Sequence, residues 1–194
     1  MPGEGSYRVK GSTLRKEIEY PSDTGRLPTI LALLSPEARA LVTNPPLASA
    51  WIDGALVDEV LAALYNSEGP QAILSMQRQL IFGPIMALLL PVSTGLVRVL
   101  GASPAALYSR FAEMTKRNVE GVDYKYTSLS HRSGKMLVRF LSTKPSPPSA
   151  FLAMGVGFEG VLRVCGVPGN VSEPEILDEN SASYLIRWGS DDNP

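Results

Sequence analysis

The stretch VDYKYTSLSHRSGKMLVRF, residues 122–140, decides the fold class of this 194-residue chain. Apolar and polar side chains alternate on both sides of the turn-like sequence HRSG at residues 131–134; the apolar positions are Val122, Tyr124, Tyr126, Met136, Val138 and Phe140. A period of two is typical of strands with one buried face. The stretch therefore predicts an antiparallel β-hairpin.

Helical spacing precedes the hairpin. Ser35-Pro36-Glu37 combines an N-cap with a proline at the first helical position, and Asn44-Pro45-Pro46 ends that short helix. From Asp53 a second helix is expected, with Asp58 and Glu59 on its polar face and an apolar stripe of Leu56, Val57, Val60, Leu61, Leu64 and Tyr65. Residues 70–82 and 84–100 continue as helices, and Ser103-Pro104 repeats the cap-and-proline start.

Downstream, residues 144–149 form a linker to a glycine-rich helix over about 150–165, and strands are expected near 170–177 and 182–188. The order predicts an α+β fold in which an N-terminal helical layer packs on a four-stranded antiparallel sheet, built as hairpin, helix, hairpin. Residues 1–25 are polar and show no sustained period, so we expect a flexible N-terminal tail, or at most a late-docking strand. A single domain over residues 26–190 follows.

The composition excludes several kinds of site. Cys165 is the only cysteine and His131 the only histidine, so the chain can form neither an internal disulfide nor a zinc site of cysteines and histidines. The sequence MPGEGSYRVKGS at the start lacks the apolar core of a secretory peptide, which predicts a cytoplasmic protein. The uncharged residues 79–97 are interrupted by prolines and glycines, so we expect a buried core hairpin or broken helix and no membrane span.

The charge is unevenly distributed although the net charge is −1. Residues 98–144 contain nine basic side chains against three acidic ones. Lys116, Arg117, Lys135 and Arg139 form the expected basic surface, which suits an acidic protein or anionic ligand better than nucleic acid. The alternative is the ordinary solvated face of a sheet.

Three glycines mark the late helix. Gly155, Gly157 and Gly160 match the spelling G-x-G-x-x-G of a dinucleotide-binding loop, but a proline-rich linker stands where that motif requires a strand. We instead expect these glycines to allow close contact between the helix and another backbone, a partner helix or a ligand chain.

No set of residues predicts an enzyme. His131 lies in a predicted turn without a carboxylate to orient it, so a catalytic base beside Ser130 or Ser128 is disfavoured. Cys165 ends an apolar helix, where a buried, inert thiol is expected and an acylated or otherwise modified thiol is the alternative. We predict no catalytic residues, no metal and no cofactor.

The hairpin beginning GVDYKY at 121–126, the helix FLAMGVGFEGVL at 151–162 and the closing strand YLIRW at 184–188 resemble an uncharacterised family of myxobacterial paralogues. That family is similar to the superfamily that joins TRAPP subunits, four-vinyl-reductase-type ligand-binding domains and haem-based nitric-oxide sensors. The resemblance implies homodimerisation through helices and, in some relatives, an enclosed apolar ligand or acyl chain. The haem branch ligates iron with a histidine on a helix, whereas His131 lies in a predicted turn.

We therefore predict a non-catalytic, homodimeric module that senses or carries a small apolar ligand. The predicted pocket lies between the helical layer and the sheet and is lined by Trp51, Leu88, Leu89, Phe111 and Phe158. The alternative is a ligand-free scaffold that holds a protein partner through its charge-polarised surface.

Overall fold

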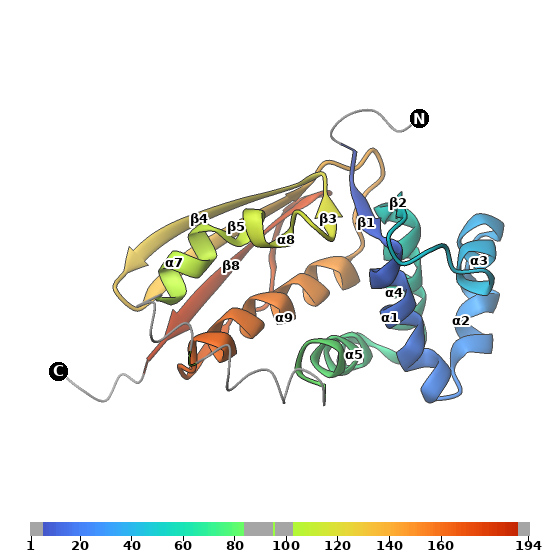
Figure 1. The fold of residues 1–194 in the computed structure, drawn as a ribbon, viewed down its shortest axis with the longest axis horizontal. Helices are drawn as coiled ribbons and strands as arrows, with labels where there is room; N and C mark the ends of the chain where they lie inside the picture. Colours follow the sequence, from blue (N-terminus) through green and yellow to red (C-terminus); the bar gives the residue numbers. More distant parts are fainter. Residues whose placement is uncertain (1–5, 84–94, 96–102, 190–194) are drawn as a thin grey trace.

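The computed structural model describes residues 6–83, 95 and 103–189, which form two antiparallel sheets and a set of helices (Figure 1). In the small sheet, β1 (Arg8–Lys10) lies between β2 (Trp51–Asp53) and β3 (Val119–Glu120). In the large sheet, β4 (Val122–Ser130) pairs with β5 (Ser133–Phe140), and β5 pairs with β8 (Ser181–Trp188). The short strands β6 (Gly169–Val171) and β7 (Glu175–Asp178) both pair with β8.

The predicted hairpin is confirmed in the register of its strands. Val122 faces Phe140 and Tyr126 faces Met136 across the β4–β5 pair. Met136, Val138 and Phe140 are buried, while Lys135 and Arg139 between them are exposed. The α+β class is confirmed as well. The large sheet has five strands because the stretch expected as one strand near 170–177 is divided around Pro174, which has no N–H to donate to a ladder.

The N-terminal helices are α1 (Gly11–Asp23), α2 (Leu27–Leu33), α3 (Pro36–Thr43), α4 (Gly54–Glu68) and α5 (Pro70–Phe82). Ser35 caps α3 by accepting a 3.2 Å hydrogen bond from the N–H of Ala38, and Asp53 caps α4 through the N–H of Ala55 at 3.0 Å. These contacts confirm the helix starts expected from the sequence. Nearly all of the helix predicted over 84–100 lies outside the described residues.

The first residues of the described chain are packed, whereas the sequence predicted a flexible tail, or at most a late-docking strand, over 1–25. Tyr7, just before β1, and Val9 on β1 are buried, and α1 buries Leu14 and Glu17. The buried face of α1 includes an acid and ends at Pro21, so it shows no plain apolar period. β1 and α1 are held in place by contacts with distant residues, and a local sequence pattern does not reveal such contacts.

The long helix α9 (Pro148–Cys165) lies between the large sheet and α5 (Figure 1). It ends at Gly166, whose φ of +65° is a left-handed C-cap. Within residues 6–83 and 103–189 it is the helix that is long and apolar enough to cross a membrane by length and composition, and half of it is buried inside the fold. Such burial fits a core helix.

Two tyrosines tie α9 to its neighbours through buried hydrogen bonds. Tyr184 on β8 donates to the carbonyl of Phe151, and Tyr108 on α7 (Pro104–Ser109) donates to the carbonyl of Phe158, both at 2.8 Å. The ring of Phe158 packs edge-on against the rings of Tyr108 and Tyr184. This aromatic cluster fixes the position of α9 beneath the sheet.

Candidate pocket between the helices and the large sheet

A pocket of about 220 Å³ lies where β1, the N-terminal helices, α9 and the large sheet meet. Its apolar wall includes Val57 and Leu61 on α4, Ile81 on α5, and the rings of Phe111, Tyr124 and Phe140. Its polar groups come from Tyr7, Thr13, Glu17, Asp58 and Gln77. A mostly apolar cavity with a few converging polar groups is the usual composition of a small-molecule site.

Two carboxyl groups are buried at this pocket. The exposed fraction is 5% for Glu17 on α1 and 4% for Asp58 on α4. Burial raises the pKa of Glu17 to about 8, and the nearby charge of Asp58 adds to the increase. Burial also raises the pKa of Asp58 to about 7, against the lowering effect of a hydrogen bond from Tyr7. Both acids therefore hold protons at a pH where an exposed carboxyl group would be ionised.

Tyr7 joins β1 to the acid on α4. Its hydroxyl donates a 3.1 Å hydrogen bond to Oδ1 of Asp58, and burial raises the pKa of that hydroxyl well above its usual value, so it stays a donor. The ring fits because Gly54, one turn before Asp58, has no side chain there: a β-carbon at Gly54 would overlap it. The ring also packs edge-on against Phe140 at 4.9 Å between centroids.

Glu17 is less completely satisfied than Asp58. A side-chain hydrogen bond with Gln77 on α5 lowers the pKa of Glu17, which partly opposes the effect of burial. The other carboxyl oxygen, Oε2, is buried and has no hydrogen-bond partner among the described residues. None of the described residues that line the pocket is a lysine, arginine or histidine. The pocket thus contains a buried carboxyl oxygen that pairs with no described group.

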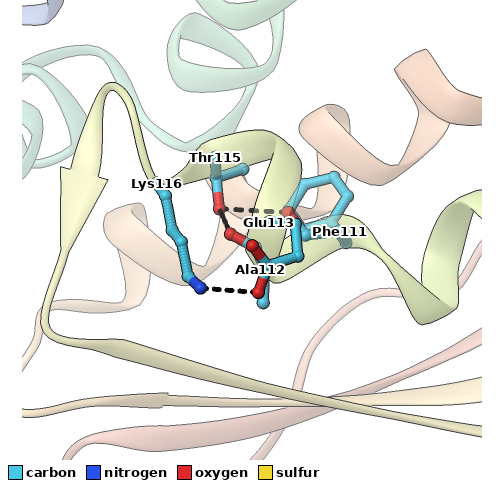
Figure 2. Close-up of polar contacts among 5 residues, drawn as sticks. All are labelled: Phe111, Ala112, Glu113, Thr115 and Lys116. Carbon is cyan, nitrogen blue, oxygen red and sulfur yellow. Dashed lines mark hydrogen bonds and ion pairs between the residues drawn. The ribbon is translucent and has the colours of Figure 1, made fainter.

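The short helix α8 (Phe111–Thr115) supplies part of the apolar wall (Figure 2). Thr115 donates to the carbonyls of Phe111 and Ala112, and Lys116 pairs with Glu113 at 2.5 Å. Figure 2 shows the ring of Phe111 pointing away from that ion pair. The ring packs edge-on against Tyr124 and Phe158, so α8 buries its aromatic side chain and exposes its charges.

The residues predicted for the pocket divide into three groups. Phe111 lines it, and Phe158 lies directly behind Phe111, fully buried. Trp51 lies elsewhere, half-buried on β2 with the Nζ atom of Lys10 3.8 Å from its ring centroid. Leu88 and Leu89 lie outside the described residues.

The sequence did not identify the two acids. Asp58 was expected on the polar face of α4 together with Glu59, but Asp58 is buried and Glu59 is only half-buried, where it accepts a hydrogen bond from the hydroxyl of Ser35. The expectation for Asp58 was wrong because α4 is covered on more than one side, by α2, α3, α5 and α9. An acidic residue within a helix that is buried on several sides is the feature that would have indicated a buried carboxyl group.

The three glycines of α9 have different surroundings. A β-carbon at Gly160 would lie 3.1 Å from Cγ2 of Ile81 on α5, and one at Gly155 would lie 3.5 Å from the Tyr184 ring. Gly157 lines the pocket, and a β-carbon there would have no described neighbour within 4 Å. Close helix contact is therefore found at Gly160, whereas Gly157 leaves pocket space open.

The four residues of the expected basic surface are all exposed but lie on different sides of the large sheet. Lys135 and Arg139 project from the outer face of β5, opposite the face that buries Met136 and Val138. Lys116 and Arg117 follow α8, whose Phe111 packs on the inner side against α9. Lys135 is also paired with Glu175 at 3.6 Å.

The remaining reactive groups are separate from the pocket. His131 is exposed in the turn between β4 and β5. Cys165 is buried at the end of α9, and burial raises the pKa of its thiol, which keeps it protonated. Among residues 6–83 and 103–189 there is no cluster of three His, Cys, Asp or Glu side chains that could hold a metal ion.

Solved structures match this geometry over nearly the whole chain, although no family model and no curated protein matches the sequence. The Fe(II) unliganded H-NOX protein from K. algicida has a TM-score of 0.62 at 12% identity, covering 95% of this chain and 99% of that chain; a mutant of it has a TM-score of 0.64 at 13% identity, covering 94% and 98%. An oxygen-binding H-NOX domain related to soluble guanylate cyclases has a TM-score of 0.57 at 13% identity, covering 96% of each chain. The chain has the H-NOX fold. This confirms the fold that the resemblance to the haem-based sensors implies, and only the fold.

The described residues do not fit a haem whose iron is ligated by a histidine on a helix, as in the haem-based sensors. The sole histidine, His131, is exposed in a hairpin turn and does not line the pocket. The pocket presents two buried carboxyl groups instead. The H-NOX fold is thus present here with a different kind of cavity.

Proposed function

We propose that this protein is a non-catalytic binding module that holds a small, largely apolar ligand in the pocket between the N-terminal helices, α9 and the large sheet. The observation that supports it is the lining of this pocket, in which the apolar side chains of α4, α5, α8 and α9 surround a few polar groups. Its volume of about 220 Å³ suits a ligand of a few ring or chain carbons rather than a large cofactor.

The non-catalytic part of the proposal follows from the chemistry of the lining. No serine, cysteine or histidine is among the described lining residues, so a nucleophile of the Ser–His or Cys–His type has no candidate there. The similarity to an oxygen-binding H-NOX domain supports a sensing role for the same fold. We further propose that the protein is cytoplasmic and that, as the sequence resemblance implies, it is a homodimer of the myxobacterial family. Native mass spectrometry would measure the dimer and any co-purifying ligand.

The experiment that tests the pocket uses toluene as the probe, because small aromatic hydrocarbons enter dry apolar cavities. Saturation-transfer NMR would measure toluene binding to the wild-type protein and to Gly157→Leu, which adds a side chain into the open space at Gly157. Ala40→Leu, an equal enlargement on the exposed side of α3, is the matched control. We expect binding to the wild type and the control, and its loss in Gly157→Leu. Equal binding to all three proteins, or to none, would overturn the proposal.

A further inference from the structure

The pocket has an electrostatic imbalance that a ligand would correct. Glu17 and Asp58 are at least nine-tenths buried, and Oε2 of Glu17 has no partner in the described part of the chain. The described lining residues include no basic side chain. A buried carboxyl group is costly unless it is protonated or paired, and a positively charged donor satisfies it better than a neutral one.

The other walls of the pocket are suited to the apolar part of such a ligand. Phe111, Tyr124 and Phe140 provide aromatic surface, and aromatic faces also attract cations. Asp58 already accepts a hydrogen bond from Tyr7, so Oε2 of Glu17 is the open acceptor. The position for a charged donor is therefore on the α1 side of the pocket.

We propose that the ligand of this pocket is a small apolar molecule bearing one ammonium group, which Glu17 binds directly and Asp58 stabilises by its negative charge. The inference rests on the proposed function, since it names the chemical class of ligand for the same pocket. An anionic ligand would find no basic side chain to pair with among the described lining residues, and a metal ion would lack a third acidic, cysteine or histidine ligand among the described residues.

Binding of an ammonium group would be linked to pH. The titratable groups facing Glu17 are Asp58 on α4, Tyr7 at the start of β1 and Tyr124 on β4, and Asp53 raises the pKa of Asp58 from the start of α4. Tyr7 and Tyr124 stay neutral because burial raises the pKa of each, that of Tyr124 to about 12. In the empty pocket Glu17 is protonated at neutral pH, so an ammonium ligand must displace a proton. Its affinity should rise as the pH increases from 6 to 8.

The test compares three molecules of similar size: benzylamine, benzyl alcohol and toluene. We expect benzylamine to bind the wild-type protein about tenfold more tightly than benzyl alcohol at pH 8, as charge-assisted hydrogen bonds exceed neutral ones. In Glu17→Gln this preference should disappear while toluene binding remains. Glu19→Gln, on the same helix but exposed, is the matched control and should keep the preference.

A second measurement needs no variant and so does not depend on the folding of Glu17→Gln. Calorimetry of benzylamine binding in two buffers of different ionisation enthalpy should detect the release of about one proton per ligand at pH 7, and toluene should release none. If toluene and benzyl alcohol bind but benzylamine binds no more tightly and releases no proton, the ammonium inference is overturned and the proposed function stands. If none of the three binds, the proposed function fails, and this inference fails with it.

Discussion

Gly54 lies directly against the ring of Tyr7, so closely that any β-carbon at position 54 would overlap the ring. The same tyrosine accepts a 3.1 Å backbone hydrogen bond from the N–H of Gly54 and donates its hydroxyl to Asp58. These contacts therefore fix the start of α4, strand β1 and Asp58 relative to one another. Four predictions about stability follow from this region and its surroundings.

The first prediction concerns Gly54→Ala. The added methyl group would force the Tyr7 ring out of place, and overpacking of this kind costs about 1–3 kcal/mol of the free energy of unfolding, measured by urea denaturation. A double-mutant cycle provides the control. In a Tyr7→Ala background the ring is absent, so Gly54→Ala should cost little. An equal cost in both backgrounds would mean that the ring is not the cause.

Tyr7→Phe tests the hydrogen bond without changing the packing of the ring. We expect a loss of about 1–3 kcal/mol, because Asp58 would remain buried without its donor. The pKa of Asp58, followed by NMR, should also rise, since the bond from Tyr7 lowers it. Tyr65→Phe is the control, because no described residue accepts a hydrogen bond from the Tyr65 hydroxyl. If Tyr7→Phe behaves like the control, the bond contributes nothing to stability.

Stability should fall with rising pH through the neutral range. The pKa of Glu17 is raised from 4.5 to about 8, so between these values the folded protein holds a proton that the unfolded chain has released. The free energy of unfolding then falls by up to roughly 1.4 kcal/mol per pH unit for such a group, and the fall ends above pH 8. Glu17→Gln removes this contribution and should be the more stable protein at pH 8. Parallel pH profiles for the two proteins, measured by urea denaturation, would contradict the assignment.

Gly157→Ala and Gly160→Ala form a matched pair on α9. Alanine at 157 enters open space and improves helix propensity, so it should stabilise the protein by about 0.5–1 kcal/mol. Alanine at 160 would lie 3.1 Å from Ile81, and this crowding should cancel or reverse the same gain. The difference between their melting temperatures measures how closely α5 and α9 pack. Equal effects would place the two positions in similar surroundings.

The elements that were predicted correctly are specified by residues close to one another in the sequence. Ser35-Pro36 and Ser103-Pro104 specify helix starts through a cap and a fixed φ angle, and the alternation through residues 122–140 specifies the hairpin. Phe111, which was predicted as a pocket residue, lies on α8 and lines the cavity. These assignments required no knowledge of distant contacts.

The missed features depend on contacts between distant parts of the chain. β1 is only three residues long and is ordered by β2 and β3, so no local period could reveal it. Glu17 and Asp58 are acidic residues that a helical pattern assigns to solvent, and only the packing of α1, α4 and α5 around them shows that they are buried. Trp51 was expected in the pocket for its size, yet its strand places it beside Lys10.

The position of β1 has a consequence for how the protein forms during synthesis. Arg8 pairs with Asp53 on one side and with Glu120 on the other. More than a hundred residues separate β1 from β3, so the small sheet can close only after β3 has left the ribosome, and such distant pairing is slow to form. Tyr7 and Val9 line the proposed pocket, so the pocket is completed late in folding.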